Sequence, residues 1–264
     1  MTTNALTAVV RSEWTKARTV RSTAWTLLLT FLISVGVGVV NCLSVKKAIA
    51  EDSPLVRPDF HPADSGFVGV GMGQLALVVF AVLLVSGEHS GGHSGGTSGM
   101  IRTSLVAVPR RGLLYGAKLT VGGGLALAVS LLTVPVAFLA SERALGPIGV
   151  PLDSPGVPWA LVGAVVQLTL VTLFSAGVAV VLRSPAMSLG VLIPFHFVLP
   201  TLMLNIPGLR RIAYHLPTQA GAQLMEVTEQ GGSTLSAGAG LTVLVAWTGA
   251  ATVAGYVALR TRDV

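Results

Sequence analysis

Six long runs without a single Asp, Glu, Lys or Arg dominate this sequence. They cover residues 22–45, 65–87, 119–141, 154–182, 184–209 and 230–259. Each run exceeds the roughly 20 residues that an α-helix needs to cross the hydrocarbon core of a bilayer. Because lipid offers the backbone no hydrogen-bond partners, such runs must be helical. The sequence therefore predicts an all-α membrane helix bundle. The expected helix cores are 23–44, 67–87, 116–139, 159–181, 187–205 and 237–259.

The composition supports burial in lipid and leaves no room for a soluble domain. Charged residues make up 11% of the 264 residues, and the mean hydropathy is +0.76; soluble domains carry about 25% charged residues. The longest connection, residues 88–118, is shorter than the roughly 50 residues that an independent domain needs. We therefore expect one transmembrane domain over residues 1–264. A phosphate-binding loop of the G-x-x-x-x-G-K-[ST] kind is absent from the sequence, so ATP is expected to bind elsewhere.

Lys and Arg are unevenly divided between alternate connections. With the N-terminus in the cytoplasm, the cytoplasmic segments contain 11 basic and 3 acidic residues, and the outer segments contain 6 and 8. Because basic residues are enriched in cytoplasmic loops, we expect both termini in the cytoplasm and the chain in the cytoplasmic membrane. The net charge of +6 then reports topology, and no nucleic-acid partner is expected.

The number of spans depends on the fifth run, residues 184–209. It contains Pro194, Pro200 and Pro207, and each proline removes a helix hydrogen bond. If this run entered the membrane without crossing it, five spans would give the same distribution of charge. The length of the run favours six spans.

The first 21 residues have the pattern of a basic amphipathic helix that lies among lipid headgroups. Glu13 falls inside its apolar arc, where it either pairs with Lys16 three residues later or contacts protein. Trp14 belongs to the apolar arc and Arg18 to the opposite face. The apolar arc consists of Leu6, Val9, Val10, Trp14, Ala17 and Val20.

Four polar residues inside the runs are candidates for lining a pathway. They are Asn41, Gln74, Gln167 and His196. Hydrogen bonding between helices is the more common role of such side chains in membranes. Charged groups are absent from the runs, which argues against a carrier coupled to protons or sodium, since such carriers use intramembrane carboxylates.

The segment after the second run repeats His-Ser-Gly-Gly at residues 89–92 and 93–96. Residues 92–96 formally match G-x-S-x-G, but that hydrolase motif needs a strand–turn–helix setting. A flexible glycine-rich turn is the simpler interpretation. The alternative from the enzyme class is an intramembrane serine protease that uses Ser94 and a histidine such as His196. A self-sufficient carrier or channel is the third alternative.

Several short motifs together resemble the type-2 permease family of ABC transporters. Residues 12–18 read Ser-Glu-Trp-Thr-Lys-Ala-Arg, which is similar to the start of bacterial permeases of this family. Glu88, Gly-Met-Ile-Arg-Thr at 99–103, Pro-Arg-Arg at 109–111 and Lys118 are similar to residues that follow the second span there. The likeness extends from end to end, except that the His-Ser-Gly-Gly repeat separates Glu88 from residue 99.

The resemblance implies a permease subunit that is not itself an enzyme and binds no cofactor or metal. It implies a dimer with a second permease copy or a homologous permease, separate ABC ATPase subunits that hold ATP and Mg²⁺, and transport of a substrate outwards. It also implies short re-entrant helices in the outer segment 206–230 and a coupling loop at 88–118. The implied contacts with the ATPase are Glu88, Met100, Ile101, Arg102, Leu105 and Arg110.

Overall fold

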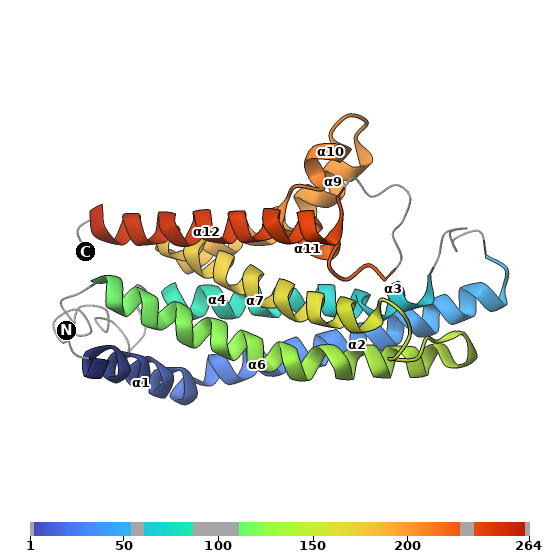
Figure 1. Cartoon of the computed structure of the whole chain (residues 1–264), viewed down its shortest axis with the longest axis horizontal. Coiled ribbons are helices and arrows are strands. Elements are labelled where there is room, and N and C mark those ends of the chain that lie inside the picture. The colour runs from blue at the N-terminus through green and yellow to red at the C-terminus, as the bar shows by residue number, and fades with distance from the viewer. Residues whose placement is uncertain (1–2, 54–60, 87–110, 228–234, 262–264) are drawn as a thin grey trace.

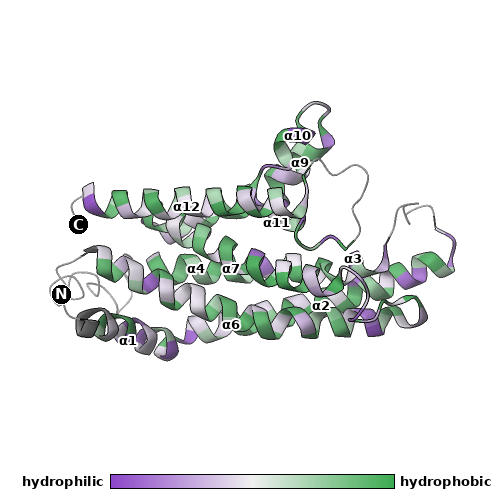
Figure 2. Ribbon diagram, viewed as in Figure 1, coloured by the Kyte–Doolittle hydropathy of each residue, from purple (hydrophilic) through white to green (hydrophobic). Residues whose placement is uncertain are grey.

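A computed structural model of the chain describes residues 3–53, 61–86, 111–227 and 235–261. Within these ranges every regular element is helical, so the predicted all-α fold is confirmed. The helices run side by side as an elongated bundle (Figure 1). Apolar residues cover the length of the bundle, and polar residues gather towards its two ends (Figure 2).

Six helical segments are long and apolar enough to cross a membrane, as predicted. The first is α2, and the second combines the short helix α3 with α4. The third and fourth are α6 and α7, the fifth begins with α8, and the last is α12. Their bounds are Arg21–Ala50 for α2, Pro62–Gly66 for α3, Val68–Ser86 for α4, Arg111–Leu145 for α6, Val157–Leu182 for α7, Pro185–Ile193 for α8 and Ala237–Thr261 for α12.

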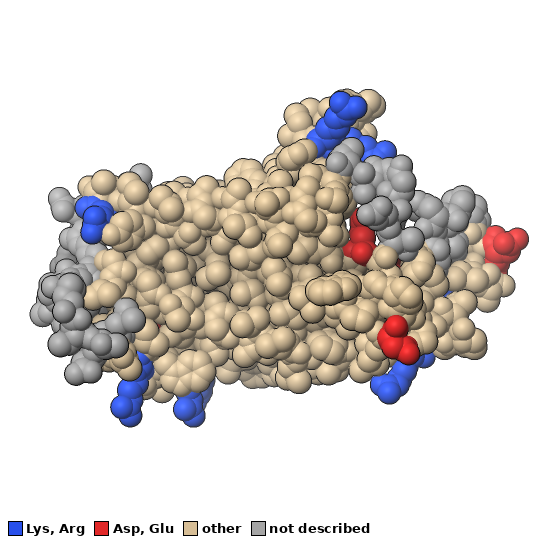
Figure 3. Space-filling model, in the orientation of Figure 1, with Lys and Arg blue, Asp and Glu red and all other residues tan. Residues whose placement is uncertain are grey.

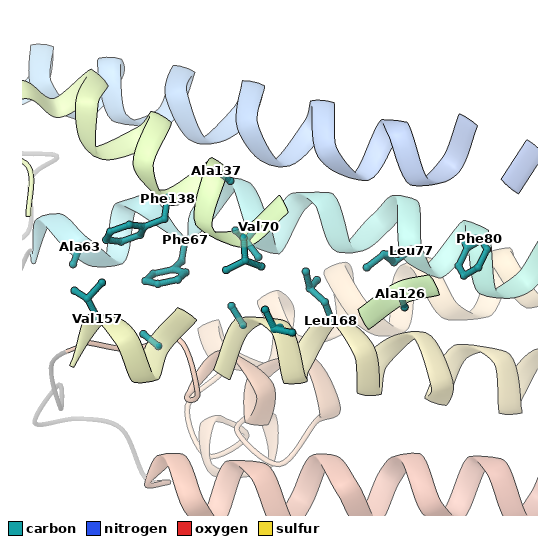
Figure 4. Close-up of a cluster of buried hydrophobic side chains, with 14 residues drawn as sticks. Ala63, Phe67, Val70, Leu77, Phe80, Ala126, Ala137, Phe138, Val157 and Leu168 are labelled. Atoms are coloured by element: carbon teal, nitrogen blue, oxygen red, sulfur yellow. The ribbon is translucent and has the colours of Figure 1, made fainter. Parts of the chain in front are cut away.

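Helices α4 and α7 form the centre of the bundle, and most of each is buried. One of the two main apolar clusters joins α3, α4, α6 and α7 (Figure 4). In it the rings of Phe67 and Phe138 lie 5.0 Å apart between centroids. On the periphery, large apolar side chains such as Trp25, Leu132 and Trp159 are exposed. Such a continuous apolar surface requires lipid around it, so the chain is a multi-pass membrane protein.

Helix α2 packs against α4 through small residues. Thr30, Ser34 and Gly38 recur at intervals of four and are buried, although half of the residues of α2 are exposed. A Cβ atom on Gly69 of α4 would collide with the carbonyl oxygen of Ser34 and the backbone of Gly38. Membrane helices gain stability from this close backbone approach, because lipid and protein are equally apolar and packing decides the contact.

Helix α6 is longer than its predicted core of 116–139 and carries charge. It begins at Arg111, inside the predicted coupling loop, and continues to Leu145. Lys118 and Glu142 are both buried in it, about 36 Å apart at 1.5 Å per residue. The expectation that the spans contain no Asp, Glu, Lys or Arg is therefore wrong for this helix, although both residues lie just outside its charge-free run, residues 119–141. The two charges flank its apolar run near either end, where polar partners can reach them.

The fifth span is interrupted at its prolines. Helix α8 ends at Ile193, a π-helical turn covers Pro194–Val198, and α9 covers Leu199–Asn205. Pro194 and Pro200 lack the N–H groups that a regular α-helix needs, which explains the wider turn between them. The whole segment, Pro185–Asn205, still has the length and hydropathy of a span.

Two short helices follow in the segment 206–230. Helix α10 covers Arg210–Ala213 and α11 covers Pro217–Ala222. Together with α9, α10 projects from one side of the bundle, whereas α11 lies against α12 (Figure 1). Gly240 of α12 allows this contact, because a Cβ atom there would collide with the carbonyl oxygen of Ala220.

Candidate functional site

One end of the bundle brings together both described chain ends and the two helices that flank residues 87–110 (Figure 1). Helix α4 ends there at Ser86, and α6 begins there at Arg111. We call it the basic end. In the described part of the chain, the charged side chains at this end include Arg11, Glu13, Lys16, Arg18, Arg21, Lys118, Arg183 and Arg260. The remaining described acidic residues lie at the opposite end, among basic residues (Figure 3).

Helix α1, Thr3–Thr19, packs against the first turns of α6 at the basic end. Val9 contacts a small apolar cluster that includes Leu114 and Ala117, and all three are buried. Ala17 is buried two turns further along the same face of α1. The face of α1 that is turned towards the protein therefore runs through Val9, Glu13 and Ala17.

Glu13 forms two ion pairs on this face. Its Oε1 accepts from Lys16 Nζ at 2.7 Å, and its Oε2 accepts from Lys118 Nζ at 2.9 Å. The Glu13 side chain is 3% exposed and that of Lys118 is 8% exposed. Both sequence interpretations of Glu13 are thus confirmed, because it pairs with Lys16 and also contacts α6. The pairing of Glu13 with Lys118 was not predicted from the sequence, although a carboxylate in an apolar arc implies that a cation lies nearby.

The amphipathic face of α1 differs from the one predicted. Val9 and Ala17 are turned to α6, whereas Trp14 is 42% exposed and Val20 is 43% exposed. The prediction placed these apolar residues together on a lipid surface. Tertiary packing divides them, because the face of α1 that lies against α6 runs through Val9, Glu13 and Ala17 and does not include Trp14. Arg11 and Arg18 are exposed beside Trp14.

The four candidate pathway residues are engaged in hydrogen bonds within the described structure. Gln167 Nε2 donates to Gln74 Oε1 at 3.0 Å between α7 and α4, and both side chains are buried. Asn41 Nδ2 donates to the carbonyl oxygen of Ser65 at 3.4 Å. Interhelical hydrogen bonding is therefore what this conformation shows for these three residues.

His196 joins the fifth span to α11. Its Nδ1 lies 2.6 Å from Thr218 Oγ1, and its ring packs edge-on against Phe174. The imidazole is 1% exposed. Thr218 was not anticipated from the sequence, because nothing in its local pattern distinguishes it from a loop threonine.

At the opposite end, Glu226 lies close to a second carboxylate. Burial, and then the nearby Asp64 carboxylate, raise the pKa of Glu226 above its usual range, while a hydrogen bond from Gln223 opposes the shift. Asp64 Oδ1 accepts from the backbone N–H of Val227 at 3.1 Å and so ties α3 to the segment after α11. Among the described residues, no group of three or more His, Cys, Asp or Glu side chains is placed to hold a metal ion.

The implied ATPase contacts fall outside the described residues. They are Glu88, Met100, Ile101, Arg102, Leu105 and Arg110. Ser94 of the protease alternative lies outside them as well. The structure does place the helices from which this segment leaves and to which it returns, beside α1 at the basic end.

No protein-family model matches this chain, and no curated protein matches its sequence. The fold therefore defines its class, which is that of multi-pass α-helical membrane proteins with six candidate spans.

Proposed function

We propose that this chain is the permease subunit of an ATP-driven ABC transporter, and that it exports its substrate as a dimer with a second permease. The observation that carries the proposal is the contact between Glu13 and Lys118. These residues belong to two separate motifs of the resemblance and are 105 residues apart in sequence, yet they pair directly. One residue from each of two separate motifs of the resemblance thus takes part in the same buried ion pair.

The same contact suggests how a partner acts on the spans. Glu13 and its apolar neighbours hold α1 against α6, and α6 begins directly after residues 87–110. An ATPase that binds this segment would displace α1 and α6 together, because separating them would expose a buried charge. ATP and Mg²⁺ belong to that partner. The positive charge of the basic end favours a cytoplasmic location for it, and hence for the ATPase.

The orientation can be tested with single cysteines. Cys42 is the only native cysteine, so a cysteine-free variant can receive Ser53→Cys, Ser98→Cys, Ser154→Cys or Ser233→Cys. With six spans and a cytoplasmic basic end, a membrane-impermeant thiol reagent should label positions 53, 154 and 233 from outside and spare position 98. Labelling at 53 and 154 without labelling at 233 would instead support five spans.

Binding of the ATPase can be tested in the coupling segment. If a helix starts near Gly99 and ends before Pro109, Ile101, Leu105 and Val108 form one apolar stripe, the spacing used in helix-in-groove recognition. Each buried aliphatic anchor contributes about 1.5–3 kcal/mol. The double variant Ile101→Asp/Leu105→Asp should therefore weaken ATPase binding by on the order of a hundredfold, measured by co-purification against the amount of membrane-inserted chain.

The matched control adds the same charge to the other side of that helix. Thr103→Asp/Ala107→Asp should retain the ATPase, because these positions lie about half a turn away from the stripe. Wild-type retention of the ATPase by an inserted Ile101→Asp/Leu105→Asp chain would place the contact elsewhere. Substrate uptake by the chain alone without ATP would favour a self-sufficient carrier, and labelling by a fluorophosphonate that is lost in Ser94→Ala would favour a protease.

A further inference from the structure

We propose that the exposed face of α1 and the start of α2 form a binding site for the headgroups of anionic phospholipids. The site consists of Arg11, Trp14, Arg18, Arg21 and Trp25. It does not depend on the transport role proposed above, because it follows from the charge, exposure and position of these residues alone.

The first three residues share one face of α1. Arg11, Trp14 and Arg18 follow one another at intervals of three and four, the spacing that places side chains in one row along a helix. The two arginines are separated by about 10 Å along the axis, and Trp14 lies between them. All three are exposed, on the side away from the buried Val9, Glu13 and Ala17. The ion pairs of Glu13 hold α1 in this rotation.

Two further members of the site follow at the start of α2, after the single extended residue Val20. Arg21 is the first residue of that helix and is exposed, and Trp25, one turn later, is 62% exposed. The site therefore has three exposed arginines and two exposed indoles within residues 11–25. Arginine suits phosphate because its planar guanidinium donates two parallel hydrogen bonds. Tryptophan is enriched where lipid headgroups meet hydrocarbon.

The site lies at the level where the apolar spans begin. Arg21, Lys118, Arg183 and Arg260 each stand at the basic end of a span, beside its charge-free run. Since Glu13 of α1 pairs with Lys118, and Arg21 follows α1 after the single residue Val20, we place the exposed face of α1 in the same layer. That layer is where the phosphate groups of a bilayer reside.

The local charge is complementary to an anion. At the basic end, Glu13 is the only acidic side chain among the described residues, and it is buried between Lys16 and Lys118. The other described acidic residues are at the opposite end of the bundle. The charge on the three exposed arginines of this face is therefore not offset by a neighbouring exposed carboxylate in the described part of the chain.

The continuity of the surface selects lipid as the occupant. From Trp25 the exposed stripe of α2 runs on through Leu28, Leu29 and Leu32, which are surrounded by acyl chains in a membrane-spanning helix. A lipid covers both parts at once, with its headgroup on the arginines and its chains on the leucines. A soluble acidic protein would match the arginines only.

The site can be tested by quenching of its own tryptophans. The chain has four tryptophans, so the variant Trp159→Phe/Trp247→Phe leaves Trp14 and Trp25 as the reporters. This full-length variant is reconstituted in phosphatidylcholine vesicles that contain equal mole fractions of brominated phosphatidylglycerol or brominated phosphatidylcholine. One basic residue near an anionic lipid surface gains about fivefold in affinity. We therefore expect brominated phosphatidylglycerol to quench the fluorescence of Trp14 and Trp25 more strongly than brominated phosphatidylcholine does. The difference should correspond to an enrichment of phosphatidylglycerol at the site of at least about fivefold over its mole fraction in the vesicle.

Two triple variants complete the experiment. Arg11→Gln/Arg18→Gln/Arg21→Gln should lose the excess quenching by phosphatidylglycerol and keep the quenching by phosphatidylcholine, which reports that the tryptophans remain at the same depth. The matched control Arg143→Gln/Arg210→Gln/Arg211→Gln removes three exposed arginines from the opposite end and should keep the excess. Equal quenching by both lipids in the parent variant, or an excess that survives the first triple variant or disappears in the control, would overturn the proposal.

Discussion

Replacing Gly69 with alanine is expected to lower the thermal unfolding midpoint of the detergent-solubilised protein by roughly 5–10 °C. The new Cβ atom would collide with the Ser34 carbonyl oxygen and with the Gly38 backbone across the α2–α4 contact. Overpacking of a tight interface costs about 1–3 kcal/mol, and more when the colliding atoms are backbone atoms that cannot rotate away. The expected consequence is that α2 separates from the centre of the bundle.

Gly71 provides the control on the same helix. A Cβ atom on Gly71 would meet nothing within 4 Å, so Gly71→Ala adds helix propensity without a collision. We expect an unchanged or slightly higher unfolding midpoint, because alanine is favoured over glycine in a helix by up to about 1 kcal/mol. Similar midpoints for Gly69→Ala and Gly71→Ala would show that α2 and α4 do not approach as closely as described.

Replacing Glu13 with glutamine is expected to destabilise the α1–α6 contact by about 3–5 kcal/mol, the usual cost of breaking a buried ion pair from one side. The substitution removes the carboxylate that both Lys16 and Lys118 contact. Hydrogen exchange of the backbone amides of residues 7–19 should become faster, while the amides of α4 and α7 should be unaffected. Lys16→Met should have a smaller effect, since the Lys16 side chain is 29% exposed.

The pair formed by Lys47 and Glu51 is a matched surface control. Its atoms are 3.8 Å apart, and both side chains are mostly exposed. Exposed pairs contribute about 0–1 kcal/mol, so Glu51→Gln should leave the unfolding midpoint and the exchange rates close to wild type. A Glu13→Gln protein with the exchange pattern of Glu51→Gln would contradict the structural role assigned to the buried pair.

Most of the architecture could be predicted because lipid restricts what a backbone can do. Runs of more than about 20 uncharged apolar residues have no option but to form helices, and all six predicted spans correspond to helical segments. The prolines of the fifth run left open whether it crosses the membrane, and the structure shows a segment of spanning length that is interrupted at Pro194 and Pro200. The position of Glu13 inside an apolar arc left two roles open, a pair with Lys16 and a contact with protein, and the structure shows both.

The ends and faces of the helices were less predictable. Helix α6 extends past the charge-free run because Lys118 and Glu142 find polar partners, Glu13 for the first and the backbone N–H of Val150 for the second. Counting charged residues along the sequence does not reveal partners that tertiary structure brings close. The contact between His196 and Thr218 was missed for the same reason, because it joins two segments whose proximity the sequence does not state.

The sequence by itself determined that this chain is helical, that it crosses the membrane several times and that its basic residues favour one end. These properties depend on the free energy of single segments in lipid, which is a sum over neighbouring residues. Tertiary structure alone decided which face of each helix is buried. In α1 it turned Val9, Glu13 and Ala17 to α6 and left Trp14 exposed. In α2 it buried Thr30, Ser34 and Gly38 and exposed the larger apolar residues. In lipid, hydrophobicity does not distinguish inside from outside, so close packing and ion pairing between distant segments make that choice.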